Sequence, residues 1–190
     1  MRILVVDESA VRAEMLRAAL LQAGYDVAAS LSSPVALLGT IERLQPDVIV
    51  IDVDSPSRDV LEHLVMVTQH TPRPIVMFAT DGSPAAIREA TRAGVSAYVV
   101  DGLDRKSIKA IVDAAVARFE EFQALRTRLA EANLKLSERK LVEKAKGLLM
   151  RRRGLDEDAA YAALRKMAMD RSLKLADVAQ RVIDAAELIG

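Results

Sequence analysis

The sequence contains no cysteine and no tryptophan, and its aromatic residues are limited to three tyrosines and three phenylalanines. Without cysteine, a disulfide framework and a thiolate-bound metal site are excluded. No uncharged apolar run approaches the length of a membrane span, and the N-terminal apolar run carries a charge, unlike a signal peptide. Since 51% of the residues are hydrophobic, the chain can bury a core, and we expect a soluble cytoplasmic protein with no membrane partner.

Net charge is also absent, because 27 basic residues balance 27 acidic ones, but the two signs are unevenly distributed. Residues 1–104 hold 8 basic and 14 acidic residues, a net −6, whereas residues 105–190 hold 19 and 13, a net +6. Basic residues are most concentrated at 139–153, where seven of them accompany one acid. This asymmetry predicts an acidic and a basic domain, with a polyanionic partner for the second. The alternative is a solvated basic face with no specific role.

The acidic half alternates short apolar runs with helical patterns. The runs predict strands at residues 3–6, 27–29, 48–51, 74–78 and 97–100. The patterns between them predict helices at residues 10–23, 34–44, 60–69 and 85–93. Five strands separated by helices indicate an α/β fold with a doubly wound, five-stranded parallel sheet. In this architecture ligands bind outside the carboxyl ends of the strands.

Three carboxylates stand at those expected strand ends. Asp7 and Glu8 close the first strand, and Asp52 closes the third. Converging carboxylates repel one another unless a cation lies among them, and oxygen ligands of this kind suit Mg²⁺. A carboxylate beside such an ion can also attack phosphorus as a nucleophile. Alternatively, the acids cap the helices that follow, as aspartate often does.

Residues 1 to about 120 resemble the receiver domain of response regulators. The resemblance rests on residues 4–9 (LVVDES) and residues 47–56 (DVIVIDVDSP). It implies that Asp52 is the phosphoacceptor and that Asp7 and Glu8 join it as metal ligands. It also implies that Tyr98 is the aromatic residue of the family's switch.

Two positions of the switch depart from the family's pattern. Ala79, followed by Thr80, stands where the family has serine or threonine, and Asp101 stands where it has lysine. The extra acid adds negative charge where a phosphoryl dianion would bind, and two like charges a few ångströms apart cost about 1–4 kcal/mol. We therefore expect a sensor or inhibitor protein to read this domain, in preference to phosphorylation by a histidine kinase.

A long helix is expected to join the two halves, because no glycine or proline stands between Gly102 and Gly147. Large apolar residues recur there at intervals of three and four, which predicts a coiled-coil linker at 119–136 between domains at 1–118 and 137–190. One seam comprises Phe122, Leu125, Leu129, Ala132 and Leu136. A second frame keeps Phe122, Leu129 and Leu136 and has Phe119 and Asn133 in place of Leu125 and Ala132. Either seam favours a parallel homodimer; the alternative is an amphipathic helix that packs on its own chain.

Three helical patterns make up the basic half. Ser137 is a candidate N-cap for the first helix, which ends at Gly154, and Asp156 is a candidate N-cap for the second. The third covers residues 175–188. Tyr161 falls near the apolar side of the second helix, and we expect it in the core. Three amphipathic helices of this kind can enclose a small all-α domain.

Residues 137–183 resemble the ANTAR domain, an RNA-binding three-helix module of transcription antiterminators. The resemblance rests on residues 145–150 (AKGLLM), residues 175–179 (LADVA), Gly154, Tyr161 and Leu164. With the receiver segment 98–103 (YVVDGL), the chain is most similar to nitrate-responsive and amidase-type antiterminators, and among them to regulators of nitrate assimilation. The resemblance implies binding to paired hairpins in leader mRNA, which prevents the terminator from forming.

Phosphate contacts are expected from the basic side chains of this domain, while the loop bases are the readable part of such RNA. The predicted RNA contacts are Lys140, Lys144, Lys146, Gly147, Arg151, Arg152 and Arg165. A second interpretation is a DNA-binding response regulator, controlled by phosphorylation of Asp52, that reads DNA with residues 175–183. A third is an adaptor without a nucleic-acid partner. The acids of the last helix weigh against the second, and the +6 charge weighs against the third. No pattern in the sequence indicates an enzyme.

Overall fold

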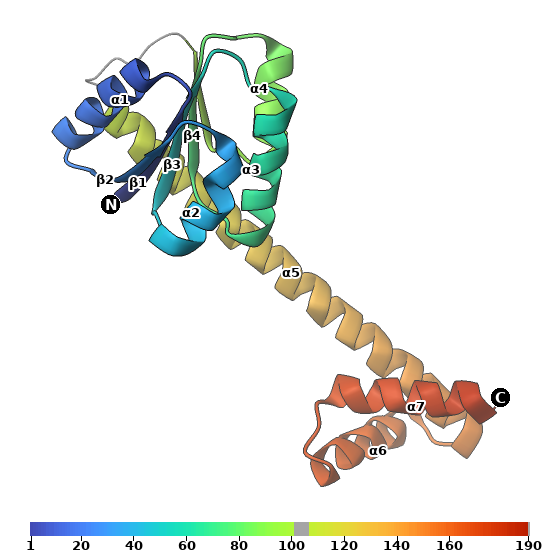
Figure 1. Ribbon diagram of the computed structural model, residues 1–190. Helices are drawn as coiled ribbons and strands as arrows, with labels where there is room; N and C mark the ends of the chain where they lie inside the picture. Colours follow the sequence, from blue (N-terminus) through green and yellow to red (C-terminus); the bar gives the residue numbers. More distant parts are fainter. Residues whose placement is uncertain (101–106, 190) are drawn as a thin grey trace. The chain divides into compact units, whose positions relative to one another are not determined.

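The computed structural model describes residues 1–100 and 107–189 and contains two compact units, Met1–Gln123 and Ala124–Gly190. Helix α5 (Ile108–Arg153) begins in the first unit and continues into the second (Figure 1). This confirms the long helix that the lack of glycine and proline predicts. Among the described helices, none has the length and apolar character needed to cross a bilayer.

The first unit is built on a five-stranded parallel sheet in the order β2-β1-β3-β4-β5, which confirms the predicted fold class. Its strands are β1 (Arg2–Asp7), β2 (Asp26–Leu31), β3 (Val48–Val53), β4 (Ile75–Ala79) and β5 (Ala97–Val100). Its other helices are α1 (Ala10–Gln22), α2 (Leu37–Leu44), α3 (Arg58–His70) and α4 (Pro84–Arg92), with a 3₁₀ turn η1 (Pro34–Ala36) before α2. The expected helix at 34–44 is therefore wrong in its first turn, which is tighter than an α-helix.

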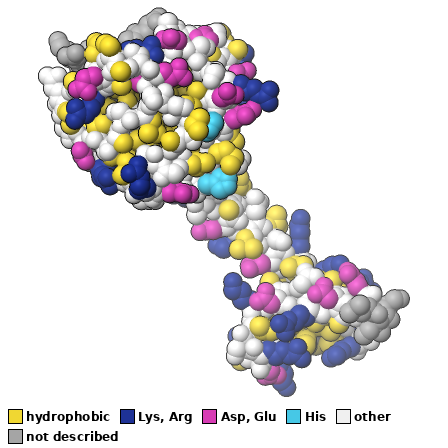
Figure 2. Space-filling view, in the orientation of Figure 1, with side chains coloured by type: hydrophobic (Ala, Val, Ile, Leu, Met, Phe, Trp, Pro, Cys, Tyr) yellow, Lys and Arg dark blue, Asp and Glu magenta, His cyan; other side chains and the backbone are white. Residues whose placement is uncertain are grey.

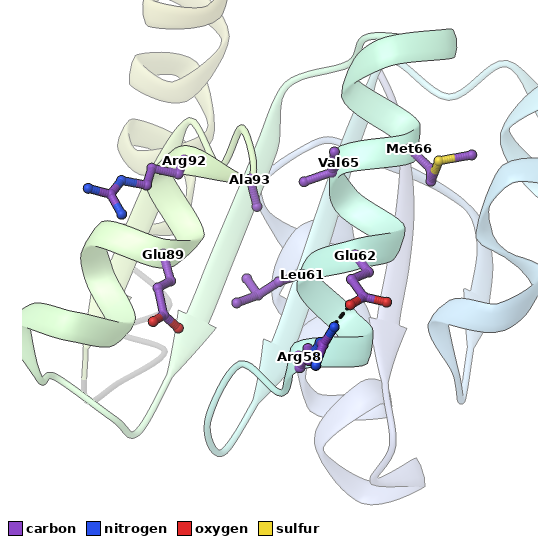
Figure 3. Close-up of a pocket in the computed structure, with 8 residues that line it drawn as sticks. All are labelled: Arg58, Leu61, Glu62, Val65, Met66, Glu89, Arg92 and Ala93. Atoms are coloured by element: carbon purple, nitrogen blue, oxygen red, sulfur yellow. Dashed lines mark hydrogen bonds and ion pairs between the residues drawn. The ribbon is translucent and has the colours of Figure 1, made fainter.

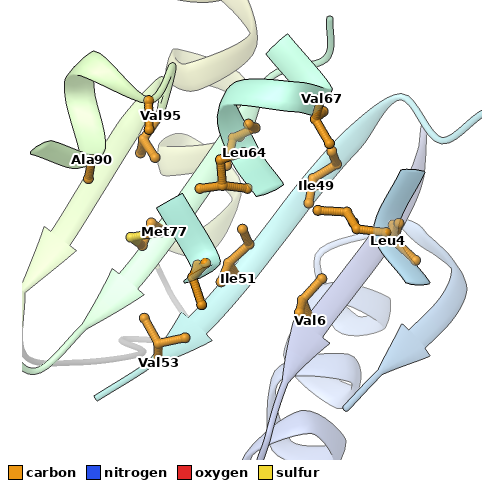
Figure 4. Close-up of a cluster of buried hydrophobic side chains, with 14 of the residues drawn as sticks. Leu4, Val6, Ile49, Ile51, Val53, Leu64, Val67, Met77, Ala90 and Val95 are labelled. Carbon is orange, nitrogen blue, oxygen red and sulfur yellow. The ribbon is translucent and has the colours of Figure 1, made fainter. Parts of the chain in front are cut away.

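Successive strand residues face opposite sides of the sheet, and each side has its own core. Leu4, Val6, Ile49 and Ile51 face a cluster that includes side chains from α2, α3 and α4 (Figure 4). The alternate residues, such as Val5 and Val50, face a cluster completed by α1 and by the first turns of α5. Because both faces are covered, the central strands read as continuous apolar runs.

Two contacts between segments distant in the sequence help to hold α3 and α5 in place in the first unit. Gly94 has φ +100°, and a Cβ added there would lie 2.4 Å from Oγ1 of Thr68, which donates a hydrogen bond to the carbonyl of Ala93 at 3.1 Å. On the other face, the Tyr25 hydroxyl donates to Oδ1 of Asp113 on α5 at 2.7 Å. Burial, followed by the neighbouring Asp113, raises the pKa of Tyr25 to about 12.

The second unit packs the end of α5 against α6 (Glu157–Asp170) and α7 (Leu175–Ile189). Its core comprises Ala145, Leu149, Ala160, Leu164, Ala168, Val178, Ala179 and Ile183. Asp156 caps α6 and accepts a hydrogen bond from the Ala159 amide at 2.7 Å, as predicted. The prediction that Ser137 caps a separate helix is wrong, since Ser137 lies inside the uninterrupted α5.

Candidate functional site

The carboxyl ends of β1 and β3 bring two acids side by side in the first unit. Asp7 and Asp52 are register partners in the sheet. Both are buried, with 2% and 9% of their surface exposed. Burial, then the negative charge of Asp7, raises the pKa of Asp52 above its ordinary value, whereas the charge of Arg12 opposes that rise. The topology therefore collects negative charge at this edge, as the sequence predicts.

Arg12 is the cation that the structure places at this edge. From the first turns of α1, its Nη2 lies 3.3 Å from Oδ1 of Asp7, and its Nη1 pairs with the exposed carboxylate of Asp54. Oδ1 of Asp7 also accepts the backbone amide of Ser9 at 2.8 Å, and the Ser9 side chain caps α1. Hydrogen bonding to Asp54 is the largest of the causes that raise the pKa of Arg12.

Sequence reasoning missed Arg12, although a signal was available. The residue stands five positions after Asp7, where the chain has just turned from β1 into α1. A long basic side chain in that first turn can reach back over the strand end.

The other oxygen of Asp7 is the atom that fits a bound cation. Its Oδ2 is buried and has no hydrogen-bond partner among the described residues. Glu8 is exposed, and across residues 1–100 and 107–189 no three acidic, histidine or cysteine side chains gather closely enough to hold a metal ion. Asp7 and Asp52 would together offer two carboxylates to Mg²⁺, which commonly takes one or two and keeps several waters. The set of Asp7, Glu8 and Asp52 as ligands stays a prediction.

The predicted switch residues surround the end of β4. Ala79 is buried at the end of that strand, and the following Thr80 is exposed, with its amide donating to the Asp54 carbonyl at 3.0 Å. The Tyr98 hydroxyl donates to the carbonyl of Asp81 at 2.6 Å. Partial burial, then the Asp81 charge, raises the pKa of Tyr98. Asp101, the predicted replacement for the family's lysine, lies outside the described residues.

A groove of about 760 Å³ separates α3 from α4 elsewhere in the first unit (Figure 3). Leu61 and Ala93 contribute apolar surface, and Arg58 and Glu62 form an ion pair of 2.7 Å within its lining. The groove collects no pair of buried carboxylates, whereas the strand ends do. The strand-end carboxylates are therefore the candidate site of this unit.

The predicted RNA contacts of the second unit fall into two groups. Lys146 is 8% exposed and lies between Glu143 and Glu157, 2.9 and 2.7 Å from their carboxylates. Hydrogen bonding to Glu157, then to Glu143, raises the pKa of Lys146. Lys146 therefore joins α5 to α6 and is poorly placed to meet a phosphate.

Two further predicted contacts are also engaged within the unit. Lys144 pairs with Glu187 at 2.9 Å, and Nη2 of Arg152 donates to the Ala186 carbonyl at 2.7 Å. Both side chains are exposed nonetheless. They connect the end of α5 to α7 and can share their charge with an anion outside.

Three predicted contacts are exposed and make no ion pair with any described residue: Lys140, Arg151 and Arg165. Gly147 is half-buried, and a Cβ there would meet no atom within 4 Å, so the backbone is open on that side. Figure 2 shows Lys and Arg side chains spread over the visible face of the second unit. Exposed, unpaired cations of this kind are suited to phosphate contact.

Tyr161 is the clearest correction in the second unit. It was expected in the core, but 44% of its surface is exposed. The buried stripe of α6 is Ala160, Leu164 and Ala168. Tyr161 lies one residue, about 100° of helix rotation, away from that stripe, so its ring reaches the surface.

The predicted coiled-coil seam is exposed along α5. Phe122, Leu125, Leu129 and Leu136 expose between 52% and 62% of their surface. They recur at intervals of three and four, which places them on one side of the helix. Within the described part of the chain these side chains are uncovered, which disfavours the alternative of packing on the same chain.

Both halves of the chain match known family models. The response regulator receiver domain matches residues 3–113, and the ANTAR domain matches residues 130–183. The transcriptional regulatory protein PdtaR of Mycobacterium tuberculosis is 31% identical over 187 residues, which cover 96% of this chain and 89% of that protein. A nitrate regulatory protein of Klebsiella oxytoca is 43% identical over 68 residues, 36% of this chain and 17% of that protein.

Among solved structures, the signal receiver domain of the response regulator NarL from Mycobacterium tuberculosis has the same fold as the first unit. It matches with a TM-score of 0.54 at 24% identity, covering 60% of this chain and 94% of that domain. The match to PdtaR spans the segments that both family models cover in this chain. The chain therefore belongs to the response regulators in which a receiver domain is joined to an ANTAR domain, a family of regulatory proteins and not of enzymes.

Proposed function

We propose that this protein is a transcription antiterminator that binds paired hairpins of a leader mRNA as a homodimer and thereby prevents a terminator from forming. The observation that carries the proposal is the set of exposed, unpaired cations on the ANTAR domain, Lys140, Arg151 and Arg165. Because such side chains release counterions from a polyanion, they supply affinity without sequence preference. Selectivity for RNA then comes from the loop bases, since the A-form major groove is closed to side chains.

The charges of α7 favour RNA over the alternative of a DNA-reading helix. Asp177, Asp184 and Glu187 are all exposed on α7, and Arg181 is the basic residue among them. Glu187 is paired with Lys144, but Asp177 and Asp184 make no ion pair with any described residue, and a helix that enters the major groove with two free carboxylates and one arginine would be repelled by the flanking phosphates. The basic residues instead concentrate at the end of α5, where residues 139–153 hold seven basic residues and one acid.

The exposed seam of α5 supports dimer formation. The four large apolar side chains of the seam are exposed on one side of the helix, and heptad spacing suits their burial against a second copy of the same helix. A dimer would also present two ANTAR domains, which matches the pairing of two hairpins. Linking two binding modules raises overall affinity without any new contact in either one.

The acidic edge of the receiver domain is the proposed input site. Mg²⁺ would be held by Asp7 and Asp52, with Glu8 nearby in sequence, and Asp52 is the candidate phosphoacceptor. Ala79 cannot donate a hydroxyl to a phosphoryl group, and Arg12 already neutralises part of the charge. We therefore favour control by a sensor or inhibitor protein over control by a histidine kinase. Regulation of nitrate or nitrite assimilation genes, from the cytoplasm, belongs to the same proposal.

The test is a binding titration of the purified full chain against a two-hairpin leader RNA and a DNA duplex of equal length at matched salt. Substituting alanine for Lys140, Arg151 and Arg165 together should weaken RNA binding. The slope of log K against log salt concentration is negative, and each lost phosphate contact reduces its magnitude by about 0.7–0.9, so the triple variant should have a slope smaller in magnitude by about 2–3.

A matched control removes three exposed arginines from the receiver domain, Arg43, Arg88 and Arg92. It changes the net charge equally but leaves the ANTAR domain intact, and it should retain the wild-type slope. The proposal would be contradicted if the wild type bound RNA and duplex DNA with equal affinity and both variants were equally impaired. The basic surface would then bind any polyanion.

A further inference from the structure

A groove on the ANTAR domain lies at the start of the basic stretch 139–153, but none of the predicted RNA contacts is in its lining. It measures about 660 Å³ and is bordered by α5, by the start of α6 and by the start of α7. Its lining includes Tyr161, Lys135, Arg139, Lys174 and Glu138. The volume is in the range of sites that hold small organic groups. The groove is therefore large enough for a single base.

The exposed ring of Tyr161 is the feature that points to a planar ligand. It is the one aromatic residue in the stretch 124–190, and its hydroxyl makes no hydrogen bond with any described residue. Val142 and Leu175 lie in the same lining and give the ring apolar neighbours. An aromatic side chain left open in a charged groove can accept a base on its face, and every base has such a face.

The charges around the ring suit a nucleotide. Lys135, Arg139 and Lys174 are exposed and make no ion pair with any described residue. Of the two acids in the lining, Glu143 is already paired with Lys146 at 2.9 Å, which leaves Glu138 as the unpaired carboxylate. Three free cations can hold the phosphates on either side of a base. A free carboxylate can accept a hydrogen bond from an exocyclic amino group.

We propose that this groove binds one unstacked base of a hairpin loop, with the base stacked on Tyr161 and the adjoining phosphates held by Lys135, Arg139 and Lys174. Glu138 gives preference to bases that carry an exocyclic amino group, and therefore disfavours uracil. The inference rests on the proposed RNA-binding function and adds to it the residues that read the loop. The groove residues are separate from Lys140, Arg151 and Arg165, so the groove inference can fail while the proposed function stands.

The affinity test uses the full-length protein and a two-hairpin RNA selected on it from a pool with randomised loops. Tyr161→Leu keeps an apolar side chain but removes the ring, and it should weaken binding about 10- to 100-fold, the loss typical of one base–aromatic stack. Tyr161→Phe keeps the ring and should bind like the wild type. Met169→Ala, at a residue of the same helix with 69% of its surface exposed, is the matched control and should leave binding unchanged.

A spectroscopic test reports stacking directly. The chain has no tryptophan, so Tyr161→Trp introduces a single indole whose fluorescence a stacked base quenches. The quench should appear with the selected RNA and vanish when one particular loop nucleotide is replaced by an abasic residue. Circular dichroism melting of each variant verifies that the domain is folded. We expect the variants to fold because the substituted side chain is exposed.

The outcomes separate the two levels of the proposal. If Tyr161→Leu binds as tightly as the wild type, or if no abasic position abolishes the quench, the groove does not hold a base. Salt-dependent RNA binding through Lys140, Arg151 and Arg165 would still support the antiterminator function in that case. If the wild type itself selects no RNA from the pool, the proposed function fails, and the groove inference fails with it.

Discussion

Replacing Arg12 with alanine is expected to strengthen Mg²⁺ binding at the acidic edge of the receiver domain by about 10- to 30-fold. In the structure the guanidinium lies 3.3 Å from one oxygen of Asp7, and the other oxygen of the same carboxylate is buried without a hydrogen-bond partner among the described residues. Arg12 and a bound metal ion therefore compete for the same negative charge. Removing the guanidinium relieves the repulsion between the two cations.

The magnitude follows from Coulomb's law. Two unit charges about 4 Å apart interact by roughly 1 kcal/mol in water and about 4 kcal/mol at the effective dielectric of a protein surface, and the double charge of Mg²⁺ doubles both values. Because 36% of the Arg12 side chain is exposed, solvent screening places the expected repulsion at the lower end of this range, about 2 kcal/mol. A change of 1.4 kcal/mol corresponds to a factor of ten in Kd.

The assay is calorimetric titration of Mg²⁺ into the wild type, Arg12→Ala and Arg17→Ala. Arg17 lies on the same helix and pairs only with Glu14, at 3.4 Å among the described residues, so its variant controls for net charge. Arg12→Ala should bind Mg²⁺ more tightly and Arg17→Ala should match the wild type. Identical Kd values for all three proteins would refute the idea that Arg12 occupies part of the metal pocket, as would an equal gain in both variants.

Three other predictions concern the linker helix, the turn before β5 and high pH. Leu129→Glu places a charge in the apolar seam and should convert the dimer to a monomer in sedimentation experiments, whereas Leu134→Glu, an exposed leucine on the opposite side of the heptad, should not. Gly94→Ala should lower the free energy of unfolding by about 1–3 kcal/mol, because of its positive φ and the clash with Thr68; unchanged denaturant midpoints would contradict this. Since the pKa of Tyr25 is raised to about 12 from 10.0, its contribution to stability is present below pH 10 and is lost as the pH rises through 12. Tyr25→Phe should remove that loss in a series of denaturant melts.

The fold could be predicted from the sequence because burial on both faces of a parallel sheet leaves an apolar run for each strand. The predicted bounds are least accurate for β2, which spans Asp26–Leu31 where residues 27–29 were expected. It lies at the edge of the sheet, where half-buried and polar residues are tolerated and the apolar signal is weak. Ser137 was misjudged for a different reason, since a capping residue can also stand in the middle of a helix when no glycine or proline stops it.

The candidate sites were predicted less completely, because the missing information concerns side-chain direction. Topology alone brought Asp7 to Asp52, but the reach of Arg12 depends on how its side chain folds back over the turn. Lys146 reads as a surface cation until Glu157, eleven residues later, is seen beside it. For Tyr161, a rotation of one residue on α6 decides between core and surface, and helical periodicity does not resolve a step of that size.

The two-sided core of the receiver domain has a consequence for the order in which the chain is made. One face of the sheet is closed by Ile108, Val112 and Ala115 at the start of α5. All five strands and α1 precede these residues, so a growing chain that stops at β5 still exposes to water the part of that face that α5 covers. The receiver domain can finish folding only after the ribosome has produced the first turns of the helix that leads into the ANTAR domain. Truncations that end before residue 115 should therefore yield an aggregation-prone sheet and not a smaller receiver domain.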